Sequence, residues 1–525
     1  METITIQEQI DKFKKETRIK LEIINGKPYY NRTLDLIGTK VTSLPDNLIV
    51  NGSLFLNGTS IKSLPDNLVV NDNLFLSYTE ITSIPDNLVV GGDLYLHFTQ
   101  ITTLPNNLLV KGNLGLSFSE IKKLPENLVV NGSLYLNGTS IKSLPDSLVV
   151  NGDINLALTK ITSFPKNVKI GKGIDLYSTQ IKSLPDNLTI NGGLNLRCTQ
   201  ITELPDSLTV EGYLDASNTK ITSLPNNLVV KGNLYLDKTE IESLPDSLVA
   251  GSSLILDHTN IASLPDNLVV NGSLCLKNTK ITKLPDNLIV SRNLELGNTL
   301  ITSLPNNMVV GGNFDLHNTP ITSLPNNLVV DGSLHLQGTN ITSLPNDLIV
   351  TGFVSLNDTL IQHYDETKIN HDVPILLSWR KGEYIKCDGI FSKVIEHKGN
   401  VWKLQDISTK KDSYLVTDGN GRYAHGETIQ EAKADLIYKI SNRDKSLYKD
   451  LTLDSEVTFE QAIEMYRVIT GACSAGTRNF VENRLKVKKD TYTVAELIEL
   501  TKGEYQSDVF AKFFTNKNNN DEYEI

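Results

Sequence analysis

A unit of 20 residues repeats sixteen times from Asn31 to Val350 without an insertion or a deletion. The unit reads x-G-x-L-x-L-x-x-T-x-I-x-x-L-P-x-x-L-x-V, as in residues 51–70, NGSLFLNGTSIKSLPDNLVV. Sixteen of the nineteen prolines occupy one slot of it, from Pro45 to Pro345 in steps of twenty. A short fixed period predicts a solenoid, in which each unit forms one coil that stacks on its neighbours.

The slots of the unit indicate what each coil contains. Leu54 and Leu56 alternate with Phe55 and Asn57, which is typical of a strand with one buried face. No stretch of the unit has room for a ten-residue helix, so the convex side should be extended or short 3₁₀. We therefore expect a parallel-β solenoid with little or no convex helix, whose interior is filled by the remaining apolar slots, represented by Ile61, Leu64 and Leu68.

A hydroxyl recurs at one corner of the coil. Threonine holds this slot from Thr59 to Thr359 and is replaced once, by Ser119. A turn leaves backbone groups buried, and a hydroxyl can satisfy them. The recurrence predicts a stacked ladder of hydrogen bonds along the solenoid.

The Asn-Gly pairs offer a competing interpretation. Residues 149–154, VVNGDI, place Asn-Gly between apolar residues, which is a strong hairpin signal. Repeated hairpins would build a meander or a propeller, but a propeller blade needs about forty residues and four strands. Other pairs replace Asn-Gly without any change of length, for example Asn71-Asp72. The pair is better interpreted as a tight corner within one coil.

The pattern L-x-L-x-x-T-x-I-x-x-L-P over residues 31–362 resembles the leucine-rich-repeat family, with Thr in a slot usually held by Asn. The 20-residue period and the Leu-Pro pairs are similar to the short repeats of bacterial effector proteins. Those repeats commonly double the Leu-Pro element, whereas here the extra length is Val-x-Gly. The resemblance implies a parallel-stranded horseshoe or superhelix with a binding concave face, and it implies no particular partner.

We expect four segments in the chain. Residues 1–30 form an N-terminal cap with a helix around residues 6–13 and an extended stretch at 19–24, and residues 31–362 form the solenoid, whose seventeenth unit is degraded. Residues 363–515 form an α+β domain, with strands at 384–394, 401–407 and 414–416, a helix opening at Thr428, and helices at 459–470, 477–484 and 494–501. Residues 516–525 are polar and are expected to be disordered.

Two segments of the C-terminal domain resemble an uncharacterised domain of tailed-phage and mobile-element proteins. They are residues 414–440, YLVTDGNGRYAHGETIQEAKADLIYKI, and residues 465–480, MYRVITGACSAGTRNF. The resemblance implies a phage-encoded protein that acts in an infected bacterium, where host takeover or counter-defence is the natural setting.

The outward slots of the strands carry the candidate partner-binding residues. Early coils present aromatic rings, which either pack between coils or form an exposed hot spot for a protein partner. Later coils present acids in the same positions, which are either solvated or a docking site for a basic partner. The aromatic set is Phe55, Phe75, Tyr78, Tyr95, His97, Phe98, Phe118, Tyr135 and Tyr177, and the acidic set is Asp215, Asp237 and Asp257.

The loop at residues 471–478 carries a weaker chemical hypothesis. Small residues lead into a helix, with Ser474, Thr477 and Arg478 as donors, and helix N-termini bind anions such as a small nucleotide. A tight turn between packed helices explains the same residues. Cys473 with His425 would suit a thiol–imidazole pair, but the Cys-x-Asp motif of effector ubiquitin ligases is absent from the sequence.

Composition excludes some classes of function. The formal net charge of −11 disfavours nucleic acid, because phosphate contacts need clustered Lys and Arg. The four cysteines are far apart, and His258, His317 and His335 are separated by coils, so we expect no metal, cofactor or disulfide framework. An N-terminus without an apolar core and the lack of an eighteen-residue apolar run favour a cytoplasmic protein without a membrane partner.

These observations favour a macromolecule-binding protein over an enzyme. The alternative is an enzyme or an anion-binding module in the C-terminal domain, with the solenoid as its targeting arm.

Overall fold

The computed structural model describes residues 5–106, 108–165, 167–362, 369–371, 375–407, 410–441, 443–472, 474–485 and 488–515. The chain divides into two compact units. The first comprises Met1–Pro285 with Leu296–Thr302, and the second comprises Asp286–Glu295 with Ser303–Ile525. No helix among the described residues is long and apolar enough to cross a membrane.

The first unit begins with a helix and a hairpin. Helix α1 (Ile6–Thr17) starts with a capping box between Thr5 and Glu8 and buries Ile10 and Phe13. It is followed by β1 (Glu22–Ile24) and β2 (Lys27–Tyr30), which pair antiparallel, and β2 pairs parallel with the first coil. The helix is four residues longer than the sequence pattern predicts, and it ends where Arg18 adopts a left-handed conformation.

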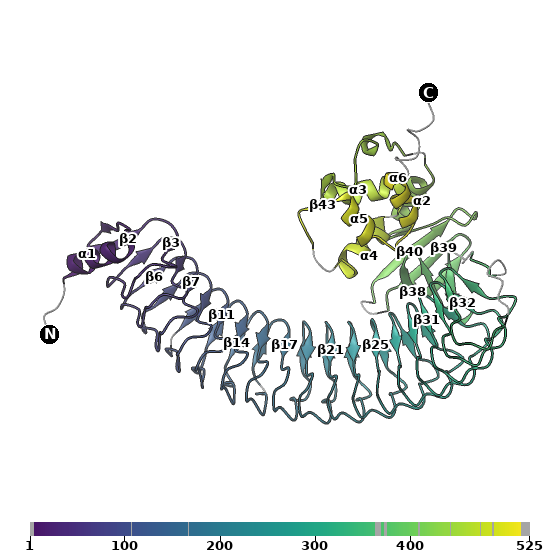
Figure 1. The fold of residues 1–525 in the computed structure, drawn as a ribbon, viewed down its shortest axis with the longest axis horizontal. Helices are drawn as coiled ribbons and strands as arrows, with labels where there is room; N and C mark the ends of the chain where they lie inside the picture. The colour runs from purple at the N-terminus through teal and green to yellow at the C-terminus, as the bar shows by residue number, and fades with distance from the viewer. Residues whose placement is uncertain are drawn as a thin grey trace. The chain divides into compact units, whose positions relative to one another are not determined.

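Each coil holds two strands of two residues. From β3 onward, the odd-numbered strands of the first unit pair in parallel with the strand twenty residues away, so that Leu54 faces Leu74 and Phe55 faces Phe75. Figure 1 shows these coils side by side, coloured from purple to teal. The odd strands are β3 (Leu34–Asp35), β5 (Leu54–Phe55), β7 (Leu74–Phe75), β9 (Leu94–Tyr95), β11 (Leu114–Gly115), β13 (Leu134–Tyr135), β15 (Ile154–Asn155), β17 (Ile174–Asp175), β19 (Leu194–Asn195), β21 (Leu214–Asp215), β23 (Leu234–Tyr235), β25 (Leu254–Ile255) and β27 (Leu274–Cys275).

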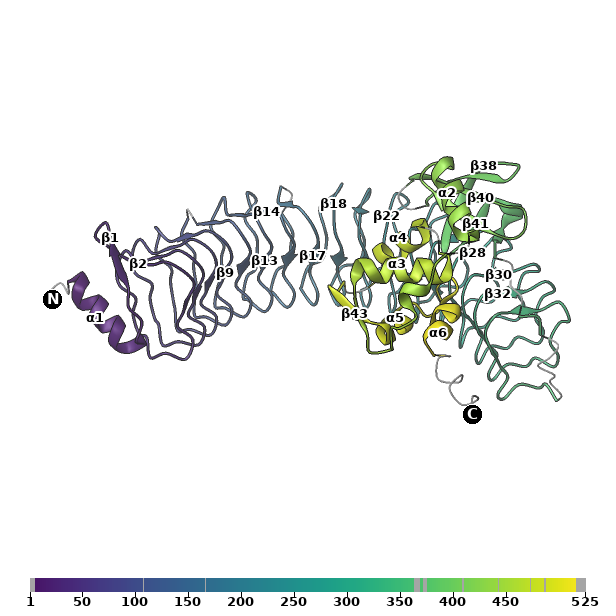
Figure 2. The same ribbon diagram turned by 90° about the horizontal axis from the view of Figure 1, so that it is seen from above.

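The even-numbered strands form a second set of parallel ladders, visible along one edge of the first unit in Figure 2. One ladder runs from β2 to β16, and a separate one starts at β18. They are β4 (Ile49–Val50), β6 (Val69–Val70), β8 (Val89–Val90), β10 (Leu109–Val110), β12 (Val129–Val130), β14 (Val149–Val150), β16 (Lys169–Ile170), β18 (Thr189–Ile190), β20 (Thr209–Val210), β22 (Val229–Val230), β24 (Val249–Ala250) and β26 (Val269–Val270).

The core of the coils follows the predicted alternation of buried and outward slots. Leu54, Leu56, Ile61 and Leu68 have no exposed surface, and most of the corresponding residues of the other coils are buried as well. No helix occurs among the described residues of 31–362. The structure therefore confirms the predicted parallel-β solenoid.

The second unit contains the last coils, with β28 (Ile289–Val290), β29 (Leu294–Glu295), β30 (Val309–Val310), β31 (Phe314–Asp315), β32 (Val329–Val330), β33 (Leu334–His335), β34 (Ile349–Val350) and β35 (Val354–Ser355). It also contains a six-stranded antiparallel sheet. The sheet is formed by β36 (Leu377–Trp379), β37 (Tyr384–Cys387), β38 (Ile390–Lys398), β39 (Val401–Gln405), β40 (Asp412–Thr417) and β41 (Tyr423–Gly426), and a 3₁₀ turn, η2 (Arg380–Gly382), follows β36.

Helices complete the α+β part of this unit. Helix α2 (Ile429–Ile440) packs on β40 and β41. A separate apolar cluster, which includes Met465, Ile469 and Phe510, joins the later helices. These elements are η3 (Ser446–Tyr448), β42 (Glu456–Thr458), α3 (Phe459–Thr470), α4 (Ser474–Asn483), β43 (Thr491–Thr493), α5 (Val494–Leu500) and α6 (Ser507–Thr515).

The prediction of three strands in the C-terminal domain was wrong. The stretch 384–394 holds two strands, because Asp388 and Gly389 both have positive φ and reverse the chain between β37 and β38. The strands β36 and β41 were missed because each is too short to show a periodic pattern, and α6 was missed as well. Three predicted helices agree in position, since Thr428, Thr458 and Thr493 each accept a hydrogen bond from the backbone N–H of the third helical residue. The helix predicted at 477–484 begins three residues earlier, at Ser474.

Candidate functional site

The residue before the recurring threonine adopts a left-handed backbone conformation in every coil. Glycine or asparagine holds this slot in many coils, as at Gly58 (φ +64°) and Asn218 (φ +53°). These residue types tolerate positive φ, whereas most others lose about 1–2 kcal/mol there.

Four early coils place a large apolar residue in this strained slot. Tyr78, Phe98, Phe118 and Leu158 have φ values of +61°, +55°, +55° and +61°. Their exposed fractions are 64%, 45%, 45% and 51%. Residues that have a strained backbone and an exposed apolar side chain contribute little to the stability of the fold, and such residues concentrate at functional sites.

The three rings form a continuous stack, which we call the outer row: Tyr78, Phe98 and Phe118. Their ring centroids are 4.6 Å apart between Tyr78 and Phe98 and 4.9 Å apart between Phe98 and Phe118. Both pairs are within 8° of parallel. Beyond Phe118 the ring covers Gly138, since a Cβ there would lie 2.4 Å from the Phe118 ring.

A second stack, the inner row, is formed by Phe55, Phe75 and Tyr95 on the odd strands. Its centroid distances are 4.5 and 5.3 Å, and these rings are half-buried. The inner row therefore combines packing between coils with a partly exposed surface. Packing between coils, one of the two alternatives considered for the aromatic set, is thus confirmed for these three residues, and a role in binding a partner stays a prediction.

His97 and Gly115 end the inner row. The His97 ring stacks on Tyr95 at 5.4 Å, and a Cβ at Gly115 would lie 2.4 Å from the imidazole. The imidazole Nδ1 accepts the Ser117 amide at 3.1 Å, and burial lowers the pKa of His97, so the ring is neutral at pH 7. Gly115 is thus required for both rings to lie over its coil.

The remaining members of the aromatic set lie apart from these stacks. Tyr135 occupies the same slot as Gly115 in the next coil and is half-buried, and Tyr177 lies two coils further on and is 38% exposed. The structure thus brings together seven of the nine predicted residues, which are the two rows and His97.

The acidic set serves the coils as well as facing outward. Asp215 accepts the Ser217 amide at 2.9 Å, and Asp257 accepts the Lys277 amide at 2.7 Å. Asp237 is half-buried. Because backbone bonds occupy two of these carboxylates, the structure favours the aromatic rows as the candidate site.

The prediction of a stacked threonine ladder was wrong in its geometry. The Thr59 hydroxyl donates to the Leu56 carbonyl at 2.7 Å, which is a bond within one coil, and the other threonines do the same. Ser119 lacks it, and its buried Oγ has no partner. The threonine methyl holds the hydroxyl in the required rotamer, which serine does not.

The ladder between coils lies at another slot, which the sequence reasoning missed. Asn73 accepts the Asp93 amide at 2.7 Å, Asp93 accepts the Asn113 amide at 2.6 Å, and Asn113 accepts the Ser133 amide at 2.7 Å. The signal was available, since Asn, Asp or Ser holds this slot in most coils.

The proposed anion loop already holds a carboxylate of the chain. The Ser474 amide and hydroxyl donate to Asp435 at 2.6 and 2.5 Å, and Arg467 pairs with the same carboxylate at 3.1 Å. Arg478 pairs with Glu427 at 2.7 Å, while Thr477 lines a neighbouring pocket. The start of α4 therefore binds a carboxylate of the chain itself, and the hypothesis of an external anion at this loop stays a prediction.

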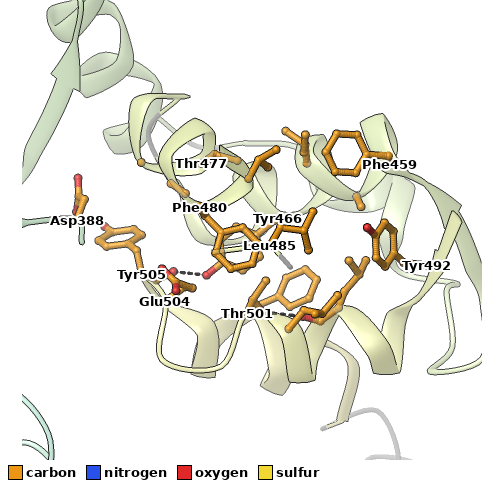
Figure 3. A pocket seen from close by; sticks show the side chains of 18 residues that line it. Asp388, Phe459, Tyr466, Thr477, Phe480, Leu485, Tyr492, Thr501, Glu504 and Tyr505 are labelled. Atoms are coloured by element: carbon orange, nitrogen blue, oxygen red, sulfur yellow. Dashed lines mark hydrogen bonds between the residues drawn. The ribbon is translucent and has the colours of Figure 1, made fainter. Parts of the chain in front are cut away.

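That pocket is an apolar cavity of about 70 Å³ among α3, α4, α5 and α6, drawn in Figure 3. Phe459, Phe480 and Leu485 contribute to its apolar lining, and Glu504 and Tyr505 lie at one end beside Asp388. The Tyr466 hydroxyl donates to the Tyr505 carbonyl at 2.7 Å, and burial raises the pKa of this phenol.

The thiol–imidazole hypothesis receives no support from the histidine. Cys473 lies outside the described residues. His425 is 1% exposed and burial lowers its pKa to about 4. No group of His, Cys, Asp and Glu side chains suited to a metal ion occurs in the described part of the chain.

No protein-family model matches the sequence, and no curated protein matches it. Among solved structures, the chain is similar to YopM from Yersinia enterocolitica WA-314, with 20% identity over 63% of this chain and 88% of that chain and a TM-score of 0.35. YopM from Yersinia pestis is 19% identical over 64% of this chain and 85% of that chain, with a TM-score of 0.37. A leucine-rich-repeat protein of Leptospira interrogans is 20% identical over 62% of this chain and 89% of that chain, with a TM-score of 0.38. With TM-scores this low, these likenesses support no statement about activity or partners.

Proposed function

We propose that the protein binds a protein partner through the outer row, Tyr78, Phe98 and Phe118, with the inner row and His97 beside it. The observation that carries the proposal is the left-handed backbone of three exposed, stacked rings. Glycine and asparagine hold the same slot in other coils and lose less free energy there. Binding of a partner explains the exposed rings in this slot, whereas the stability of the fold does not.

The geometry of the stack favours an apolar contact. Parallel stacking turns the ring faces toward each other, so mainly ring edges face outward. Ring edges carry the positive part of the aromatic quadrupole and attract neither Lys nor Arg. A partner surface of aliphatic side chains and backbone carbonyls therefore fits the outer row, and such aromatic clusters are typical of interface hot spots.

The test is a triple variant, Tyr78→Asn, Phe98→Asn and Phe118→Asn. Asparagine suits the left-handed slot, so the relieved strain offsets part of the lost stacking, which is about 0.5–1.5 kcal/mol per pair. We expect the variant to fold and to lose the proteins that the wild type retains from a bacterial extract.

The matched control changes the same slot in later coils, with Lys238→Asn and His258→Asn beside the native Asn218. These residues also have left-handed backbone and are exposed. The control should retain what the wild type retains. Retention of the same proteins by the triple variant would refute the proposal, and the extract of a phage-infected culture tests the counter-defence setting that the C-terminal resemblance implies.

A further inference from the structure

The last coil of the second unit carries an edge strand that nothing in the described part of the chain covers. Strand β35 (Val354–Ser355) pairs in parallel with β33 of the coil before it. The Leu334 amide donates to the Phe353 carbonyl at 3.0 Å across this pairing. No described strand pairs with the other side of β35, which is therefore the edge of the odd-numbered sheet.

The preceding coils show which backbone donors face outward from this edge. The Phe314 amide donates to the Ser333 carbonyl of the next coil at 2.9 Å, and the amide two residues further on makes the same kind of bond. In the last coil the corresponding N–H groups belong to Val354 and Leu356. No described residue accepts a hydrogen bond from either of them.

Two carbonyls complete the edge. The Gly332 carbonyl accepts the Gly352 amide at 2.9 Å, so the Gly352 carbonyl in turn faces away from the solenoid. In a parallel ladder the N–H and the carbonyl of one residue face the same neighbour, so the Val354 carbonyl faces outward as well. The Leu356 carbonyl instead accepts the Thr359 hydroxyl at 2.8 Å. The edge thus presents donors at 354 and 356 and acceptors at 352 and 354.

The side chains at this edge are apolar and incompletely buried. Leu334 and Leu336 have no exposed surface, whereas Val354 and Leu356 in the same slots of the last coil are half-buried. Phe353 is 57% exposed in a slot that Asn, Asp or Ser holds in most coils. Terminal coils usually have a polar outer face, and edge strands are usually protected by charges or proline. Strand β35 has neither protection.

The chain covers the neighbouring edge and the opposite end of the solenoid. On the even-numbered side of the last coils, the Val350 amide donates to the Asn370 carbonyl at 3.0 Å, where a further coil would lie. At the start of the chain, α1 lies against the first coil, and Glu16 accepts the Thr42 amide at 3.0 Å. Leu34 of that coil has no exposed surface. The bare edge at β35 is a contrast to both.

From this geometry we propose that β35 pairs antiparallel with β35 of a second copy of the chain, across a twofold axis at Val354. The two Val354 residues donate to each other, and the Leu356 N–H of each copy donates to the Gly352 carbonyl of the other. The four outward groups of each copy are then all bonded. The contact continues the sheet that already joins one coil to the next, and twofold pairing is the commonest form of association between identical chains.

Sedimentation velocity of the full-length protein tests the pairing. We expect a proportion of dimer that rises with concentration up to about 100 μM, as a micromolar Kd gives. Val354→Pro removes the central donor but no hydrogen bond within the chain, and proline is tolerated on an edge strand. This variant should dimerise about tenfold more weakly or not at all. The control, Val354→Thr, keeps the N–H and the shape of the side chain, and it should dimerise like the wild type.

A pair of charged variants keeps the test independent of the proline. In the proposed pairing, Phe353 of one copy lies directly opposite Ser355 of the other, and neither side chain belongs to the buried core. Glutamate at both positions, or lysine at both, places like charges opposite each other and should leave each variant monomeric. A mixture of the two variants should form a heterodimer, because opposite charges then face each other.

Three results would overturn the proposal. They are a wild type that is monomeric at every concentration, a dimer that Val354→Pro leaves unchanged, and a mixture of the charged variants that does not associate. Circular dichroism of each variant establishes that it is folded. None of these residues belongs to the aromatic rows, so the outcome is independent of the proposed function.

Discussion

Replacing Asn113 by alanine should destabilise one contact between neighbouring coils. The Asn113 Oδ1 accepts the Ser133 amide at 2.7 Å, and Ser133 is 8% exposed. Alanine leaves this buried N–H without a partner, which costs about 1–3 kcal/mol. Coils contact only their neighbours, so the cost falls on the contact between these two coils and is not shared along the solenoid.

Urea denaturation followed by circular dichroism measures the change as a lower midpoint at an unchanged slope. The control is Asn113→Asp, which keeps an acceptor at the same position, as Asp93 and Asp153 do in their coils. We expect Asn113→Asp to stay within about 0.5 kcal/mol of the wild type. If both variants lose the same stability, or if alanine is neutral, the ladder does not hold the coils together.

Three further predictions follow from single residues. Thr199→Val removes the hydrogen bond from a buried hydroxyl to the Leu196 carbonyl, but this carbonyl still accepts the Thr199 amide at 3.2 Å. The free energy of unfolding should therefore fall by only about 1 kcal/mol in the same assay. Thr202→Val, at an exposed position, should be neutral. Leu158→Asn should raise stability by about 0.5–1 kcal/mol, because it relieves left-handed strain at a half-exposed side chain, and a loss comparable to that of a buried leucine would contradict this. Burial lowers the pKa of His425 to about 4 in the folded chain, whereas the unfolded chain protonates this residue near the ordinary pKa of 6.5. The free energy of unfolding should therefore be highest above about pH 6.5 and fall by up to about 3 kcal/mol toward pH 4. Urea titrations across pH should show a smaller pH dependence for His425→Asn.

The sequence predicts the solenoid well because its information is local and repeated. The alternation of Leu54 and Leu56 with outward residues recurs in each unit, so inside and outside follow from period alone. The left-handed slot was less accessible. Gly58 and Asn218 signal it, but Tyr78 and Phe98 hide it, because aromatic residues rarely adopt positive φ.

Contacts between distant residues could not be predicted from one sequence. Asp435 caps α4 from 39 residues away, and Lys439 reaches Asp388 across 51 residues. Neither pair leaves a periodic or spacing signal. The threonine hydroxyl was placed in the correct slot but given the wrong partner, because a repeat shows which residue recurs and not whether its bond is within or between coils.

Photo-crosslinking from the outer row tests the central claim most directly. A benzophenone amino acid replaces Phe98, where the side chain is 45% exposed, and in a second protein it replaces His258 in the same slot of a later coil. Irradiation in a bacterial extract should join a second protein chain to position 98 and none to position 258. Adducts of equal yield at both positions, or an adduct at position 258 alone, would contradict binding through the aromatic rows.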